Sequence, residues 1–249
     1  MLWSACEAGV ADAPVCLPEA LLPAGWCGRV DTAGLALSCE RTQSCLSSAV
    51  ANGGLVRTRG FINMHLREDR PLGAHDPADW IAVHAENAGL PAGSVGMMTG
   101  ASMRSLRVAG TAIADQRIAV VLTAGLANAR RAGDTAEYHA LYPAGQLTGT
   151  INLALLTSVP LECAAMAETL ATLTEAKAAV LQSSAITSPV SGELATGTGT
   201  DATAVFCPVQ GRPVRYTGKH TQFGECAARL VIEALGDAIA QDARVMHAG

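Results

Sequence analysis

The sequence predicts a single layered domain of the α/β class, mixed α+β in character, with helices covering one or more largely buried β-sheets. Residues 117–123 contain an uninterrupted apolar run that is typical of a central strand. Residues 150–157, a long helix over 160–182 and the apolar residues 202–207 follow one another, which indicates a crossover between parallel strands. A last amphipathic pattern over 225–240 predicts a helix that packs on the same sheet.

Composition limits the classes of function. The 249 residues can bury a substantial core, and 49% of them are hydrophobic. No stretch reaches the ~18 uninterrupted apolar residues of a membrane helix. The net charge of −5 and the pI near 5.7 argue against nucleic acid as a partner, and 4% aromatic residues are few for stacking on bases. We therefore expect neither a membrane nor a nucleic-acid partner.

The eight cysteines form no Cys-x-x-Cys pair, which disfavours a zinc knuckle. The first residues lack the basic and apolar regions of a secretory signal. These features predict a cytoplasmic protein with reduced, mostly buried thiols. The alternative is a disulfide within the group Cys16, Cys27, Cys39 and Cys45.

Residues 1–44 are expected to form an irregular lead-in to a domain that spans residues 45–249. Residues 1–30 are rich in Pro, Ala, Gly and Cys and show no clear period. A short strand is expected at 35–39, and Asn-Gly-Gly at 52–54 is a strong turn signal.

The next segments predict strands on either side of a helix. Residues 60–66 alternate in polarity, which places Asn63 and His65 on one face of a strand. Asp76 precedes a proline and is expected to cap a helix that ends near residue 89. Residues 95–109 are expected to form a hairpin.

One stretch, residues 195–225, concentrates polar and titratable side chains. Its first half alternates Gly and Thr, so that in an extended backbone the threonines line one face and the glycines allow close approach of a ligand. Composition alone favours a simpler interpretation, a Gly-rich turn followed by a helix cap. The second half packs five such side chains into ten residues: Tyr216, Lys219, His220, Thr221 and Glu225.

Five segments of the chain resemble the signature segments of the adenosylcobinamide amidohydrolase family and occur in the same order. Two of them are Gly-Thr-Gly-Thr-Asp at 197–201 and Tyr-Thr-Gly-Lys-His-Thr at 216–221. Each motif is weak by itself, but five in order are specific, and the resemblance covers roughly residues 45–235. The other segments are 123–134, 149–157 and 175–177, with a weaker match at 47–63.

The resemblance implies hydrolysis of an amide of adenosylcobinamide, which releases 1-amino-2-propanol and leaves adenosylcobyric acid. This reaction belongs to corrinoid salvage for cobalamin biosynthesis. The implied partner is a small-molecule corrinoid, which is the substrate rather than a cofactor, and no other cofactor is implied. Such a site must supply a nucleophile or an activated water, donors for the oxyanion and an acid for the departing amine.

Metal-activated water is one route, and it needs about three His or carboxylate ligands. The six histidines are scattered and no His-Glu-x-x-His motif occurs. The sequence therefore predicts no metal site. The alternative is a site formed by four side chains: His65, Asp69, His84 and His220.

A hydroxyl nucleophile is the second route, and Thr150 is the candidate. It opens a predicted strand, and Asn152 lies on the same face two residues later. Residues 149–157 also loosely resemble the nucleophile segment of self-processing aminopeptidases and ornithine acetyltransferases. That second resemblance implies self-cleavage at the Gly149–Thr150 bond. The alternative is an ordinary threonine at the start of a strand.

His220 and Lys219 are the candidates for acid–base catalysis, because His titrates near neutral pH and an apolar pocket can lower the pKa of a Lys. Asp201 could orient His220 or bind the aminopropanol hydroxyl. The alternatives are a solvent-facing or substrate-orienting pair and a turn-capping carboxylate. With Thr150, these residues form the predicted catalytic set.

Further residues are predicted to bind the substrate. Asn128 could donate to the oxyanion or make a local turn bond, and Arg131 could meet peripheral amides of the corrinoid or lie at the surface. Glu175 is two residues from Lys177, so the two point in different directions on a helix, and one of them is expected to point into the site and the other to solvent. The complete predicted binding set is Asn128, Arg131, Asn152, Thr198, Gly199, Thr200, Tyr216, Thr217 and Glu175.

Two other functions fit the same residues. One is a non-catalytic corrinoid-binding protein that keeps the pocket, and the other is an amidase for a smaller substrate. The oligomeric state stays open, and an oligomer is compatible with the sequence.

Overall fold

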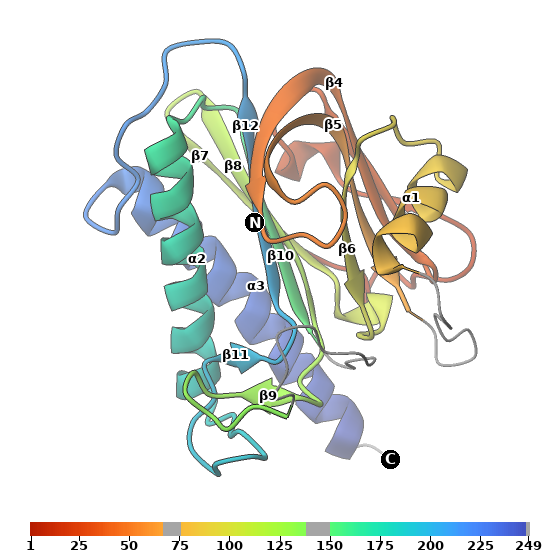
Figure 1. Ribbon diagram of the computed structural model, residues 1–249, viewed down its shortest axis with the longest axis vertical. Helices are drawn as coiled ribbons and strands as arrows, with labels where there is room; N and C mark the ends of the chain where they lie inside the picture. Colours follow the sequence, from red (N-terminus) through yellow and green to blue (C-terminus); the bar gives the residue numbers. More distant parts are fainter. Residues whose placement is uncertain (67–75, 138–149, 248–249) are drawn as a thin grey trace.

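The structure is a computed structural model that describes residues 1–66, 76–137 and 150–247 (Figure 1). Ten strands form one mixed sheet, and β9 and β11 form a separate two-stranded sheet. Three α-helices cover the large sheet from both sides, so the predicted fold class is confirmed. The helices are α1 (Pro77–Asn87), α2 (Cys163–Ser183) and α3 (Gln222–His247).

The strands vary from two to fourteen residues in length. Short 3-10 helices precede β3 and β7, at Glu19–Leu21 and Met103–Ser105. The strand bounds are β1 Leu2–Ser4, β2 Val15–Cys16, β3 Trp26–Asp31, β4 Gly34–Ser47, β5 Gly54–His65, β6 Val95–Thr99, β7 Arg107–Ile113, β8 Gln116–Ala124, β9 Ala129–Arg130, β10 Ile151–Thr157, β11 Gly197–Thr198 and β12 Ala202–Pro208.

The long strand β4 folds the sheet over on itself. Its register with β5 shifts between Ser38 and Gln43. Beyond this irregularity its C-terminal half pairs with β12, whereas its N-terminal half pairs with β3. The sheet therefore has a first wall, made of β3, β4, β5 and β6, and a second wall, made of β7, β8, β10 and β12.

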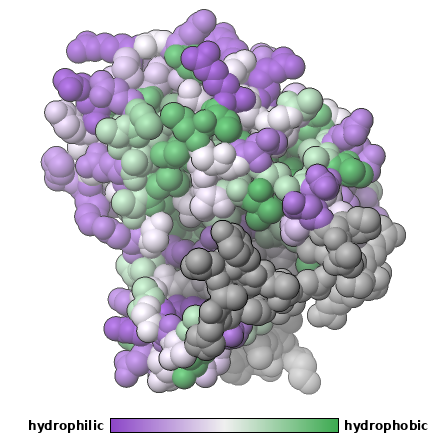
Figure 2. Space-filling view, in the orientation of Figure 1, coloured by the Kyte–Doolittle hydropathy of each residue, from purple (hydrophilic) through white to green (hydrophobic). Residues whose placement is uncertain are grey.

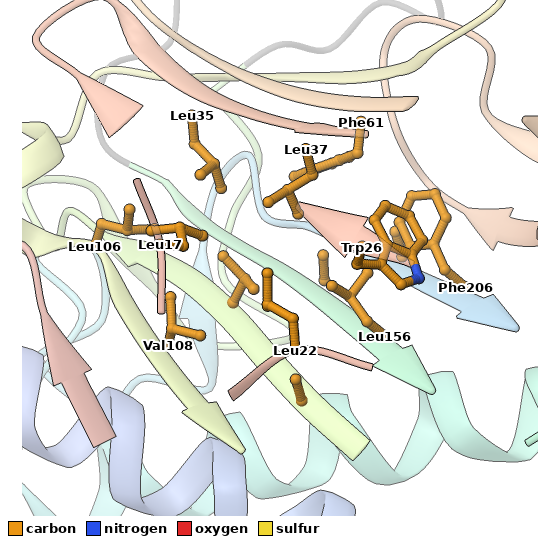
Figure 3. Close-up of a cluster of buried hydrophobic side chains, with 14 of the residues drawn as sticks. Leu17, Leu22, Trp26, Leu35, Leu37, Phe61, Leu106, Val108, Leu156 and Phe206 are labelled. Atoms are coloured by element: carbon orange, nitrogen blue, oxygen red, sulfur yellow. The ribbon is translucent and has the colours of Figure 1, made fainter. Parts of the chain in front are cut away.

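The main core fills the space between the two walls. Figure 3 shows Leu37 and Phe61 of the first wall on one side of this cluster and Val108 and Leu156 of the second wall on the other. Phe206 makes edge-to-face contacts with Trp26 and Phe61, at ring-centroid distances of 5.5 and 5.6 Å. Burial of these side chains supplies the hydrophobic free energy that holds the walls together.

The outer faces of the walls carry the helices. The second wall packs against α2 and α3, and the first wall packs against α1 through Ile62 and Met64. Every residue of β10 is buried, which is typical of a central strand. Figure 2 shows hydrophilic side chains along the outer margin of one face and apolar side chains gathered toward its middle.

The predicted crossover is confirmed. Strands β10 and β12 run parallel with Asn152 opposite Ala202, and α2 connects them. Asp76 caps α1 as expected, because its carboxylate accepts the N–H of Ala78 at 2.8 Å. Within the described residues, no helix is both long and apolar enough to cross a membrane.

Two local predictions differ from the structure. Residues 1–44 are more regular than an irregular lead-in, because β1, β2, β3 and most of β4 lie there. The partner of β1 is distant in sequence, since Leu2 pairs with Ala109, whereas β2 pairs with β3 and β3 forms a tight hairpin with β4 that the sequence analysis missed. The hairpin over 95–109 is wrong. Strand β6 pairs in parallel with β5, whereas β7 pairs with β8.

Candidate functional site

A buried polar network closes one end of the space between the two walls. Asn152 of β10 donates through Nδ2 to Asn63 Oδ1 at 2.7 Å and to the Met98 carbonyl at 2.9 Å. Asn63 of β5 donates in turn to Thr123 Oγ1 of β8 at 2.9 Å. Since a carbonyl only accepts, the Met98 bond fixes the orientation of the Asn152 amide. The Asn152 oxygen therefore faces the Thr150 hydroxyl, which lies 3.4 Å away.

Thr150 is buried and directly precedes β10, two residues before Asn152. Its hydroxyl donates to the Thr200 carbonyl at 2.7 Å and lies 3.4 Å from Asn152 Oδ1. The Thr150 carbonyl accepts the N–H of Gly125 at 3.0 Å. The predicted nucleophile and the predicted binding residue Asn152 therefore lie together, as expected for neighbours on one face of a strand.

Asp201 organises the loop that faces Thr150. Its carboxylate accepts the N–H groups of Ile151 and Thr198 at 2.9 and 3.0 Å and the Thr198 hydroxyl at 2.5 Å. It also forms an ion pair with Lys177 of α2, and the two side chains are only 11% and 7% exposed. This carboxylate therefore has four partners. They join the start of β10, the loop of residues 197–200 (the Gly-Thr loop) and α2.

The Gly-Thr loop packs against the segment around Asn128. Gly197 and Thr198 of β11 pair with β9, and the Gly199 N–H donates to the Asn128 carbonyl at 3.2 Å. A Cβ at Gly199 would lie 3.4 Å from Asn128 Nδ2. The Asn128 side-chain oxygen is buried and lacks a hydrogen-bond partner within the part of the chain that the structure describes. An unpaired buried acceptor is costly, so this atom is suited to a donor from a ligand.

Arg131 lies at the surface beside this loop. Its guanidinium donates to the Leu194 carbonyl at 3.0 Å, and its N–H donates to Asp134 at 2.8 Å. Hydrogen bonds from Ser188, from Ser191 and from the Arg131 N–H lower the pKa of Asp134. These contacts connect the segment after β9 with the segment before β11.

The second half of the polar stretch 195–225 lies along another side of α2. Thr217 is buried, and its N–H donates to Glu168 at 2.6 Å while its hydroxyl donates to the Ala165 carbonyl at 2.8 Å. Lys219 forms an exposed ion pair with Glu175. Tyr216 is 66% exposed. This group therefore faces solvent, except for Thr217.

The structure does not place His220 beside Asp201. A Cβ at Gly218 would stand 2.7 Å from Glu168 Oε1 and 3.4 Å from His220 Cε1. The His220 ring therefore lies near Glu168 of α2. Glu168 and Lys177 are nine residues apart on α2, which is about 13.5 Å along the axis and half a turn around it. The predicted site residues thus form two groups, one with Thr150 and Asp201 and one with Lys219 and His220.

The described histidines that the sequence analysis kept as alternative metal ligands also lie in different places. His65 Nδ1 is 2.9 Å from the Thr32 carbonyl, and His84 stacks on Trp80 of α1. Asp69 lies outside the described residues, as does Gly149 of the proposed self-cleavage bond. In the described ranges, no three His, Cys, Asp or Glu residues gather as metal ligands would. All eight cysteines are free thiols.

Three residues of the Thr150 group were not among the predicted site residues: Asn63, Thr123 and Lys177. Alternation in β5 had placed Asn63 on one face, but nothing local indicated that this face meets β10. Thr123 ends an apolar strand, but it is also the first residue of the matched segment 123–134, and Lys177 is the last residue of the matched segment 175–177, so the family resemblance was a signal for both. Lys177 lies among buried positions of α2 such as Leu173 and Val180, and a lysine on an apolar helix face is a signal of a buried ion pair.

Comparison with known proteins gives a consistent result. The family model described as adenosylcobinamide amidohydrolase matches residues 28–246. The chain is 28% identical over 193 residues to the adenosylcobinamide amidohydrolase of Methanosarcina mazei, covering 74% of this chain and 84% of that protein.

A second relative and one solved structure are also similar to the chain. An uncharacterized protein of Methanocaldococcus jannaschii is 39% identical over 158 residues, which are 56% of this chain and 61% of that protein. The chain thus matches less than two thirds of that relative's length. A crystal structure of a protein from Pyrococcus horikoshii covers 83% of this chain and 77% of its own. Its TM-score of 0.43 and identity of 10% are too low to carry an argument.

Proposed function

The chain belongs to the adenosylcobinamide amidohydrolase family, and we propose that it hydrolyses the aminopropanol amide of adenosylcobinamide. The products are adenosylcobyric acid and 1-amino-2-propanol, and the reaction serves corrinoid salvage in the cytoplasm. The observation that carries this proposal is the family match over residues 28–246, which includes both groups of predicted site residues.

We assign the chemistry to the group around Thr150. The Thr150 oxygen attacks the amide carbon, and its proton passes to a base. The bond from carbon to nitrogen then breaks, and the amine leaves with a proton from the same base. Water hydrolyses the resulting ester and restores the Thr150 hydroxyl. In this scheme Asn128 donates through Nδ2 to the substrate carbonyl, and its Oδ1, which has no partner among the described residues, accepts an N–H or O–H group of the substrate. Asp201 holds the Gly-Thr loop against the start of β10.

The second group has a different proposed role. Tyr216, Lys219 and His220 are largely exposed and lie half a turn of α2 away from Asp201, so we assign them contacts with remote parts of the corrinoid. Replacement of His220 by Ala should then raise KM more than it lowers kcat. Self-cleavage at Thr150 is a separate proposal, and the intact mass of the purified protein tests it directly.

The experiment that tests the proposed function follows the products. Purified protein is incubated with adenosylcobinamide, with and without a chelator, and the mixture is analysed by mass spectrometry. Adenosylcobyric acid and free aminopropanol in equal amounts are the expected result, and activity in the chelator supports a side-chain nucleophile. Retention of unchanged adenosylcobinamide by the protein would support the binding-protein alternative instead. Cleavage of simple amides alone would support an amidase for a smaller substrate.

A further inference from the structure

We propose that His65 is a catalytic residue of this site, the base that accepts the proton of Thr150 and returns it to the departing amine. The inference rests on the proposed function and deepens it. It replaces His220 with a histidine on the wall that faces β10.

The position of His65 follows from the contact between the two walls. Asn63 of β5 and Asn152 of β10 touch across the interior at 2.7 Å. His65 follows Asn63 by two residues and Thr150 precedes Asn152 by two, so each lies on the same face as its asparagine. Phe61, on this same face of β5, packs deeper in the core. Leu156, on the same face of β10 as Asn152, also packs in this core. His65 and Thr150 are therefore both displaced from the asparagine contact in the direction away from these core residues, each by about 6.6 Å along its strand.

The hydrogen bond of His65 sets its tautomer. Its Nδ1 lies 2.9 Å from the carbonyl oxygen of Thr32. A carbonyl oxygen accepts but cannot donate, so Nδ1 carries the proton in the neutral ring. Nε2 then keeps a lone pair that can accept a proton. The backbone holds the residue in place, because the His65 N–H donates to the Ala33 carbonyl at 2.9 Å and β5 pairs with β6 beside it.

The other described groups around Thr150 are poor bases. The Thr150 hydroxyl contacts a backbone carbonyl and the amide oxygen of Asn152, and neither takes a proton near neutral pH. The Asp201 carboxylate is engaged by four partners, and one of them is the ammonium group of Lys177. His65 lies beyond the asparagine contact on the facing wall and carries a basic nitrogen for which the described residues supply no ion-pair partner.

The proton balance of the reaction needs such a group twice. As Thr150 Oγ bonds to the amide carbon, its proton moves to His65 Nε2. The imidazolium then protonates the nitrogen of 1-amino-2-propanol as the bond from carbon to nitrogen breaks. In the second half, His65 takes a proton from water as the water oxygen attacks the ester, and it returns this proton to Thr150 Oγ.

The test uses two replacements of His65 and one control. His65→Asn keeps an N–H that can donate to the Thr32 carbonyl but removes the basic nitrogen. His65→Gly leaves space for added imidazole. His84→Asn changes a histidine on α1 that lies outside the proposed site. For each variant, kcat and KM with adenosylcobinamide, the affinity for the corrinoid and the melting temperature are measured.

The expected result is a loss of at least about 100-fold in kcat for His65→Asn, with KM and corrinoid affinity nearly unchanged. Imidazole should raise the rate of His65→Gly in proportion to its concentration, and His84→Asn should behave like the wild type. Wild-type kcat in His65→Asn would overturn the inference and leave the proposed function standing. So would parallel losses of binding and fold without rescue by imidazole, which would mark a structural role. A wild-type protein that does not hydrolyse adenosylcobinamide would overturn both.

Discussion

At the scale of single residues, the ion pair of Lys177 with Asp201 shows how the site is held together. Both side chains are almost fully buried, and the carboxylate also receives two backbone N–H groups and a hydroxyl. Ionised groups of this kind are stable inside a protein only when they are paired and hydrogen-bonded. The pair therefore serves to fix the Gly-Thr loop, which leaves proton transfer to another residue.

Replacement of Lys177 by Met should lower the free energy of unfolding by about 3 kcal/mol, because it leaves the Asp201 carboxylate buried without its cation. Lys219→Met is the matched control. The ion pair of Lys219 with Glu175 is exposed, with side-chain exposures of 66% and 56%, so its loss should cost about 0–1 kcal/mol. Urea denaturation measures both. Equal losses in the two variants would contradict the assigned role of Lys177.

Burial of a thiol makes a second prediction at this scale. Burial raises the pKa of Cys45 from 9.0 to about 12. Well below pH 9, near neutral pH, the thiol is protonated in both the folded and the unfolded chain, so it adds no pH dependence there. Between pH 9 and 12 the unfolded chain loses this proton first. Stability should therefore fall as pH rises, by up to about 1.4 kcal/mol per pH unit from this group.

Urea denaturation at pH 8.5, 9.5 and 10.5 measures this effect. The Cys45→Ala variant lacks the thiol and serves as the control, since all other titrating groups are shared. Its stability should fall less steeply with pH than that of the wild type. Parallel curves for the two proteins would show that the thiol does not contribute.

At the scale of elements, the loop that includes β11 depends on the absence of a side chain at one glycine. A Cβ at Gly197 would stand 2.5 Å from Asp201 Oδ2 and 3.2 Å from Lys177 Nζ. At Gly199 the nearest atom is Asn128 Nδ2 at 3.4 Å, which is an ordinary contact. The two glycines of one motif thus have different structural roles.

Gly197→Ala should displace the Asp201 carboxylate and lower the free energy of unfolding by about 1–3 kcal/mol, as overpacking of a core does. Gly199→Ala should change it by no more than about 0.5 kcal/mol. Chemical denaturation of both variants checks this difference. A larger loss in Gly199→Ala than in Gly197→Ala would refute the assignment.

The elements that could be predicted from the sequence are those whose signals are local. The cap at Asp76 and the succession from β10 through α2 to β12 follow from neighbouring residues, and both were confirmed. Strand β4 was predicted only in part, since the polar residues between Ser38 and Gln43 interrupt its pattern where the register shifts. Strand β6 was placed in a hairpin because its parallel partner, β5, lies across α1 in the sequence.

At the scale of the whole molecule, the folding over of one sheet creates the candidate site. The two walls bring the ends of β5 and β6 against the ends of β8 and β10, and four strands contribute to one polar network. The contact of Thr150 with Asn152 could be predicted from the sequence because both belong to one strand. The contact of Asn63 with Asn152 could not, since it depends on the path of β4.

The path of the chain also explains why Asp201 and His220, which the sequence analysis grouped together, lie apart in the structure. The two residues are close in sequence, but Asp201 lies beside Lys177 of α2, and β12 and the following loop carry the chain to the part of α2 around Glu168 before His220 is reached. Proximity along the chain was therefore a poor guide to proximity in space. We therefore keep the proposal that the chemistry takes place at Thr150, which lies in the group with Asn152 and Asp201.

The measurement that tests this claim most directly is the turnover of adenosylcobinamide by Thr150 variants. Thr150→Ser keeps the hydroxyl and Thr150→Ala removes it, while Thr174→Ala removes an exposed hydroxyl on α2 as a control. We predict that the Ser variant and the control form adenosylcobyric acid, and that the Ala variant binds the corrinoid but releases no aminopropanol. Turnover by Thr150→Ala at the wild-type rate would contradict the account.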